Sequence, residues 1–142
     1  MNHYYHAIHT MMNRLVDRLL LYECRGFKEN RKGKNLSLLD VQILYRITNG
    51  EEKKLHEIVR ETGLERNLIA SSVRRLLSCG YIQKEQSEKD RRVHILKATD
   101  SGKEFIALKQ KEQKEWLERI LEDMSLNETK AVLKFLTNIE KK

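Results

Sequence analysis

Residues 55–97 read LHEIVRETGLERNLIASSVRRLLSCGYIQKEQSEKDRRVHILK, and their pattern sets the architecture of the chain. Apolar residues from Leu55 onward recur at helical spacing and stop before Gly63, a residue suited to the left-handed conformation that ends a helix. A second apolar stripe follows after a short turn and comprises Leu68, Ile69, Val73, Leu76 and Leu77. The pattern predicts a helix, a tight turn and a second helix that Gly80 closes.

Two segments after the second helix have the composition of β-strands. Residues 81–86 and 92–97 carry β-branched and aromatic side chains, and residues 87–91 between them are polar and charged. Strand-like runs on either side of a short polar segment typically pair as a hairpin. We therefore expect a β-hairpin with a basic tip directly after the second helix.

The second helix should expose a polar and cationic face opposite its apolar stripe. Arg and Asn side chains can pair bidentately with guanine and adenine edges in the major groove, and a basic hairpin tip can reach the neighbouring minor groove. Exposed charge is ordinarily a solvated helix face, but a glycine turn before it and a basic hairpin after it favour contact with DNA. The residues of this face are Arg66, Asn67, Ala70, Ser71, Arg74 and Arg75.

The hairpin and the segment after it resemble the MarR-type winged-helix regulators, whose wing is marked by Asp-x-Arg before its second strand. The matching residues here are Asp90, Arg91 and Arg92, followed by residues 99–102 (TDSG), which are similar to the start of the family's next helix. The resemblance implies that Arg92 contacts the minor groove while Asp90 holds a nearby arginine in position. Asp90, Arg91 and Arg92 thus join the residues of the helix face as candidate DNA-binding residues.

The rest of the chain is predicted to be helical, so the expected fold class is mainly α with a small β-hairpin wing. We expect one domain over residues 1–142, with a winged helix-turn-helix DNA-binding lobe at residues 36–98. Residues 1–35 and 99–142 resemble the family's dimerisation helices and would form a dimerisation lobe. Ser37, Thr99 and Ser125 are the predicted N-caps of three helices. The apolar stripe of the first helix is too wide for one small core, which favours a homodimer.

Composition indicates the class of partner. The chain has 142 residues and a formal net charge of +7, which favours an anionic partner such as nucleic acid, although an anionic membrane surface would also suit it. No apolar run approaches the ~20 residues that span a bilayer, so we expect a cytoplasmic protein without a membrane partner. Two cysteines, Cys24 and Cys79, are too few for a disulfide framework.

The histidines and cysteines of the sequence have simpler interpretations than metal or redox sites. His3, His6 and His9 share one helix face only approximately and no cysteine or carboxylate accompanies them, which favours a polar helix start, with a metal site left open. Both cysteines are expected to be packing residues, with oxidant sensing left open. The sequence contains no catalytic motif, so we expect neither an enzyme nor a cofactor.

The predicted function is a homodimeric transcription regulator, most simply a repressor, that binds a pseudo-palindromic operator in double-stranded DNA. By resemblance, a small-molecule effector or an oxidant would release it from DNA. The alternative is a winged-helix protein-interaction module whose basic face binds an acidic protein without sequence-specific DNA binding.

Overall fold

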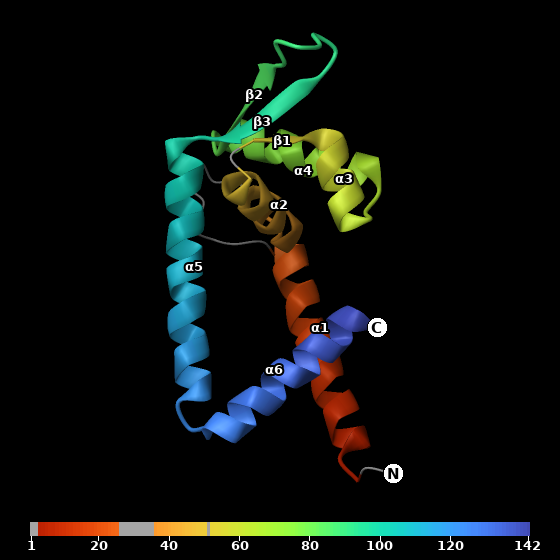
Figure 1. The fold of residues 1–142 in the computed structure, drawn as a ribbon, viewed down its shortest axis with the longest axis vertical. Coiled ribbons are helices and arrows are strands. Elements are labelled where there is room, and N and C mark those ends of the chain that lie inside the picture. The colour runs from red at the N-terminus through yellow and green to blue at the C-terminus, as the bar shows by residue number, and fades with distance from the viewer. Residues whose placement is uncertain (1–2, 26–35, 51) are drawn as a thin grey trace. The chain divides into compact units, whose positions relative to one another are not determined.

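The computed structural model describes residues 3–25, 36–50 and 52–142, in two compact units, Met1–Ile106 and Ala107–Lys142. Figure 1 shows the helices and the small sheet, which confirm the expected fold class. In chain order the elements are α1 (Tyr5–Arg25), α2 (Leu38–Asn49), β1 (Lys53–Lys54), α3 (Leu55–Thr62), α4 (Arg66–Cys79), β2 (Ile82–Gln86), β3 (His94–Ala98), α5 (Asp100–Leu121) and α6 (Leu126–Lys141).

Side-chain caps begin α2 and α6 as the sequence predicts. The Ser37 hydroxyl accepts the backbone N–H of Asp40 at 3.1 Å, and the Asp40 carboxylate accepts the backbone N–H of Ser37 at 3.0 Å. Ser125 and Glu128 form the same reciprocal pair at α6, with distances of 3.1 and 3.0 Å. Each pair satisfies two donors that a helix start would otherwise leave without partners.

Glycine ends both helices of the helix-turn-helix, α3 and α4. Gly63 and Gly80 have φ angles of 69° and 75°, in the left-handed region that residues with a Cβ adopt only at a cost. The N–H of Gly63 donates to the carbonyl of Val59. The predicted ends of both helices are therefore confirmed.

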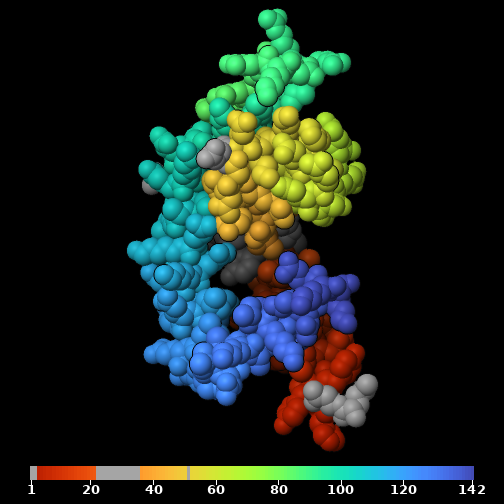
Figure 2. All heavy atoms as spheres, viewed as in Figure 1, coloured from red at the N-terminus to blue at the C-terminus, as the bar shows by residue number. Residues whose placement is uncertain are grey.

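The sheet has three antiparallel strands in the order β1-β3-β2. The predicted hairpin is formed by β2 and β3, in which Ile82 pairs with Ala98 and Gln86 pairs with His94. Its second strand begins later than expected, because a turn in which the N–H of Val93 donates to the carbonyl of Asp90 keeps the preceding residues in the loop. Figure 2 shows this wing, coloured green, projecting beyond α3 and α4. The two-residue strand β1 was not predicted.

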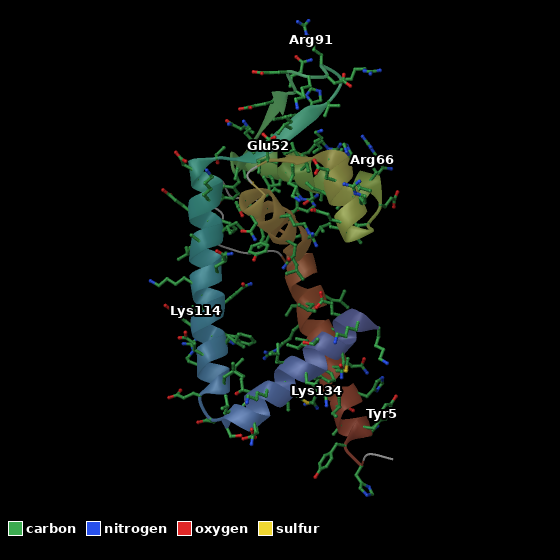
Figure 3. All side chains as sticks on the ribbon, in the orientation of Figure 1. Tyr5, Glu52, Arg66, Arg91, Lys114 and Lys134 are labelled. Atoms are coloured by element: carbon green, nitrogen blue, oxygen red, sulfur yellow. The ribbon has the colours of Figure 1, made fainter. Side chains whose placement is uncertain are left out.

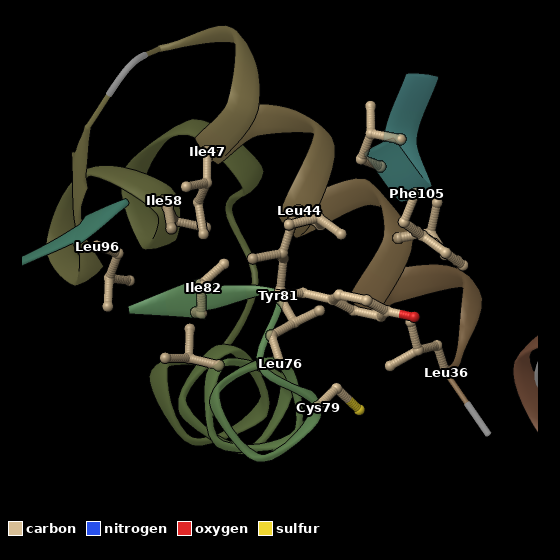
Figure 4. Close-up of a cluster of buried hydrophobic side chains, with 14 of the residues drawn as sticks. Leu36, Leu44, Ile47, Ile58, Leu76, Cys79, Tyr81, Ile82, Leu96 and Phe105 are labelled. Carbon is tan, nitrogen blue, oxygen red and sulfur yellow. The ribbon is translucent and has the colours of Figure 1, made fainter. Parts of the chain in front are cut away.

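A single hydrophobic core holds the winged helix together (Figure 4). The aromatic rings of Tyr81 and Phe105 stack with centroids 4.9 Å apart, so the first turns of α5 belong to this core. Leu68, which the periodicity assigned to the buried stripe of α4, is instead 45% exposed, and that part of the prediction is wrong. The fully buried apolar side chains are Leu36, Ile43, Leu44, Ile47, Ile58, Ile69 and Leu76.

The helices outside the winged helix carry large apolar side chains that this chain leaves uncovered. On α1 these include Met11, Leu15 and Leu20, which are 57–58% exposed. On α6, which has no buried residue, they include Leu133 at 65% and Leu136 at 56%. Within the described parts of the chain, no helix combines the length and apolar character needed to cross a bilayer.

Candidate nucleic-acid interface

A cationic groove lies where α3 and α4 face the wing. It has a volume of about 390 Å³, and its lining includes residues of α3, α4 and all three strands. Among the described residues that line it there is no carboxylate, and the histidines are His56 and His94. Its five basic side chains are Lys54, Arg66, Arg74, Lys84 and Arg92. With no carboxylate among the lining residues, these cations make the groove a favourable place for an anionic polymer.

The outer face of α4 carries most of the predicted helix contacts. Arg66, Asn67 and Arg74 are exposed, whereas Ala70 and Ser71 are half-buried. The guanidinium of Arg74 donates to the Ser71 hydroxyl at 3.0 Å, one turn away along the helix. Arg66, Ala70 and Arg74 line the groove, so three of the predicted contacts lie together beside the wing.

Arg75, also a predicted DNA contact, differs from these residues because its guanidinium is paired within the protein, and its contact with DNA stays a prediction. Its Nε and Nη2 donate to the two carboxylate oxygens of Asp40, at 2.9 and 2.8 Å. Asp40 is fully buried, and the Arg75 side chain is 42% exposed. Arg75 is therefore part of the contact between α4 and α2 and is not one more solvated cation on the helix.

At the wing tip, the carboxylate of Asp90 binds Arg92. Asp90 was expected from the sequence to hold a nearby arginine. The Asp90 carboxylate accepts the backbone N–H of Arg92 at 3.0 Å and its Nε at 3.2 Å, while the Arg92 side chain stays 90% exposed. The hydrogen bonds from the side chain and then the backbone of Arg92 lower the pKa of Asp90, so this carboxylate is ionised at neutral pH. Figure 3 shows Arg91 at the tip of the wing. The arginine that Asp90 orients is thus Arg92 itself.

Known proteins share the winged-helix fold of this chain. Residues 36–102 match the family model described as a winged helix DNA-binding domain. FabT from Streptococcus pneumoniae, solved in complex with DNA, is 24% identical with a TM-score of 0.81, over 97% of this chain and 95% of that one. A MarR structure is 26% identical with a TM-score of 0.70, over 91% of this chain and 88% of the other. The transcriptional regulator SlyA is 18% identical with a TM-score of 0.72, over 99% and 93%. The chain has the winged-helix fold of the MarR-type structures. No curated protein matches the sequence.

The MarR-type fold confirms the expected fold class and supports a DNA-binding regulator. The division into a DNA-binding lobe and a dimerisation lobe stays a prediction, as do the individual DNA contacts.

Four lysine and histidine residues that line the groove were not among the predicted contacts: Lys54, His56, Lys84 and His94. Lys54 belongs to a two-residue strand that is too short to show any periodicity. Lys84 could have been found, because it lies two residues after buried Ile82 and alternate residues of a strand share a face. It pairs with Leu96 of β3, which also lines the groove.

The predicted candidates for metal binding and oxidant sensing that the structure describes, His3, His6, His9 and Cys79, do not line this groove. His3, His6 and His9 are exposed, and no cluster of three His, Cys, Asp or Glu side chains suited to a metal ion occurs among the residues that the structure describes. Cys79 is 3% exposed and belongs to the hydrophobic core, as expected for a packing residue. The side chain of Cys24 lies outside the described residues.

Proposed function

We propose that this chain is a homodimeric transcription repressor that binds a pseudo-palindromic operator in double-stranded DNA and is released by a small-molecule or oxidant signal. The observation that carries the proposal is the groove beside the recognition helix α4, where five basic side chains occur without a carboxylate. In the proposed complex α4 enters the major groove, and Arg91 and Arg92 reach the minor groove from the wing. The DNA-bound FabT structure, which has the same fold, supports this mode of binding.

Homodimer formation is proposed from the uncovered apolar faces of α1 and α6. Side chains such as Leu15 and Leu133 are more than half exposed in the single chain. Monomeric proteins seldom leave contiguous apolar patches of this kind in water, and a second copy of the chain is the simplest cover. A two-fold dimer presents two recognition helices, which requires two half-sites about 10 base pairs apart.

Release by a signal is proposed from the resemblance to MarR-type regulators. Burial of Cys79 in the core keeps that thiol away from dissolved oxidants, which favours a small molecule over oxidation of Cys79 as the signal.

The test begins with selection of bound sequences from random duplex DNA, followed by titration of the selected operator at several salt concentrations. A sequence-specific regulator should prefer one palindromic sequence, and its affinity should fall with a log–log salt slope of about −0.9 per phosphate contact. Inserting about five base pairs between the half-sites turns one of them to the opposite side of the duplex and should abolish tight binding.

Two substitutions link the DNA affinity to the groove. Arg74→Ala should weaken operator binding, whereas Lys103→Ala is the matched control, because Lys103 is an exposed cation of the same compact unit outside the groove. Failure of the selection to enrich any sequence, together with tight binding to an acidic protein, would replace this proposal with the interaction-module alternative.

A further inference from the structure

Asp40 has surroundings that differ from those of every other charged side chain in the described parts of the chain. Among the charged side chains of the described residues, Asp40 is the only buried one, with 0% of its surface exposed. Its Oδ2 accepts the backbone N–H of Ser37 at 3.0 Å and Nε of Arg75 at 2.9 Å. Its Oδ1 accepts Nη2 of Arg75 at 2.8 Å and the hydroxyl of Ser72. Both oxygens therefore use their full capacity as acceptors.

Three of these four hydrogen bonds join two helices at one point. Asp40 lies in the first turn of α2, and its side-chain partners Ser72 and Arg75 lie on α4, 32 and 35 residues further along the chain. Ser72 is also fully buried, so both α4 contacts reach the carboxylate from the packed side of the helix. Since hydrogen bonds are directional and apolar packing is not, this cluster restricts how α4 can slide or rotate on α2.

The ionised carboxylate needs all of these partners. Burial by itself would raise the pKa of Asp40, but the hydrogen bonds from Arg75, Ser72 and the Ser37 backbone outweigh it and lower the pKa. A buried charge whose partners are removed is strongly unfavourable, so the carboxylate and its two α4 partners act as a unit.

We propose that Asp40 is a positioning residue that fixes the recognition helix α4 on α2 for base readout, and that Arg75 acts on DNA binding through Asp40 and not as a phosphate contact. This inference rests on the proposed function. Base readout requires contact groups held to within about 0.5 Å, whereas non-specific attraction to phosphates tolerates a looser helix. The cluster should therefore govern the preference for the operator over random DNA.

The experiment compares Asp40→Asn with the unchanged protein in binding both the selected operator and random duplex. An Asn side chain keeps one acceptor oxygen and turns the other position into a donor that faces the donors of its present partners. The ratio of operator affinity to random-duplex affinity should fall by about tenfold, the loss of one good base contact, while random-duplex affinity stays within about twofold.

Arg75→Gln and Arg74→Ala separate positioning from phosphate contact. Arg75→Gln should lower the same ratio and leave the salt slope unchanged, whereas Arg74→Ala, a groove residue, should make the slope shallower by about 0.9. Asp40→Asn combined with Arg75→Gln should be no worse than either change alone, because both disrupt one unit.

Thermal melts accompany each measurement, and binding is measured well below the melting temperature. If Asp40→Asn does not fold, Ser72→Ala takes its place, since it removes one hydrogen bond and leaves the ion pair. The inference is overturned if the folded variant keeps the operator preference, or if Arg75→Gln makes the salt slope shallower by the amount of one phosphate contact. An unchanged protein that prefers no sequence would instead overturn the proposed function.

Discussion

Replacing Gly102 by alanine tests the junction between the recognition helix and α5. A Cβ at this position would stand 2.1 Å from the carbonyl oxygen of Tyr81, a backbone atom that no side-chain rotation can move. Carbon and oxygen atoms ordinarily approach to about 3.3 Å, so α5 and the segment after α4 would have to separate by about 1 Å. This shift would strain two hydrogen bonds: Thr99 donates its N–H to Tyr81 at 3.0 Å and its hydroxyl to Gly80 at 2.6 Å.

Three contributions set the expected change in the free energy of unfolding of Gly102→Ala. Overpacking costs about 1–3 kcal/mol, and each hydrogen bond that is lost costs about 1 kcal/mol. Against this, Gly→Ala within a helix gains about 1 kcal/mol. With one or both hydrogen bonds lost, Gly102→Ala should therefore lower the free energy of unfolding by about 1–4 kcal/mol, the opposite sign to that of Gly→Ala in an exposed helix.

Denaturant unfolding followed by circular dichroism measures this difference. Ser101→Ala is the matched control, because Ser101 is the exposed neighbour of Gly102, and its effect should stay within about 0.5 kcal/mol. A Gly102→Ala protein as stable as the parent, or more stable, would refute the close approach of α5 to Tyr81.

Three further predictions concern the wing, the dimer and the buried acid. Arg92→Ala should weaken operator binding and leave the thermal melt unchanged, because its side chain is 90% exposed; equal affinity in a binding titration would contradict its role. Sedimentation at micromolar concentration should give twice the chain mass of 16.9 kDa, and Leu133→Glu on α6 should shift it toward the monomer; a monomeric parent protein would exclude the two-half-site model. Because the pKa of Asp40 is lowered by folding, its contribution to stability should be complete above about pH 4 and be lost as the pH falls through the folded value. Unfolding curves measured from neutral pH downward should therefore be less pH-dependent for Asp40→Asn.

Local chemistry made much of the fold predictable. Ser37 and Ser125 each have an acidic residue three positions later, and these pairs begin helices as expected. Gly63 and Gly80 end helices because few other residues tolerate a positive φ. In each case the interacting atoms lie within a few residues of one another, so the sequence itself displays the interaction.

The features that the sequence did not reveal depend on partners that are distant along the chain. Periodicity assigned Leu68 to the buried stripe, but it cannot say how far the packed neighbours extend, and Leu68 is left exposed. Arg75 looked the same as Arg74 in the sequence, yet it bonds to Asp40, 35 residues earlier. The same Asp40 was predicted only as part of the Ser37 cap, since nothing local indicates its contacts with α4.

The placement of acidic residues explains why a groove with such a cationic lining forms in a chain whose net charge is only +7. Glu61 pairs with Lys53, Glu85 with Lys97 and Asp40 with Arg75, and none of these residues lines the groove. Among the groove cations, Arg92 pairs with an acid, Asp90 at the exposed wing tip. At physiological salt the Debye length is about 8 Å, so a bound phosphate feels the groove cations far more than the charges elsewhere on the chain. Lys84→Glu and Lys103→Glu lower the net charge equally, but only Lys84 lines the groove. The affinity for DNA should therefore follow the charge of the groove and not the net charge of the protein.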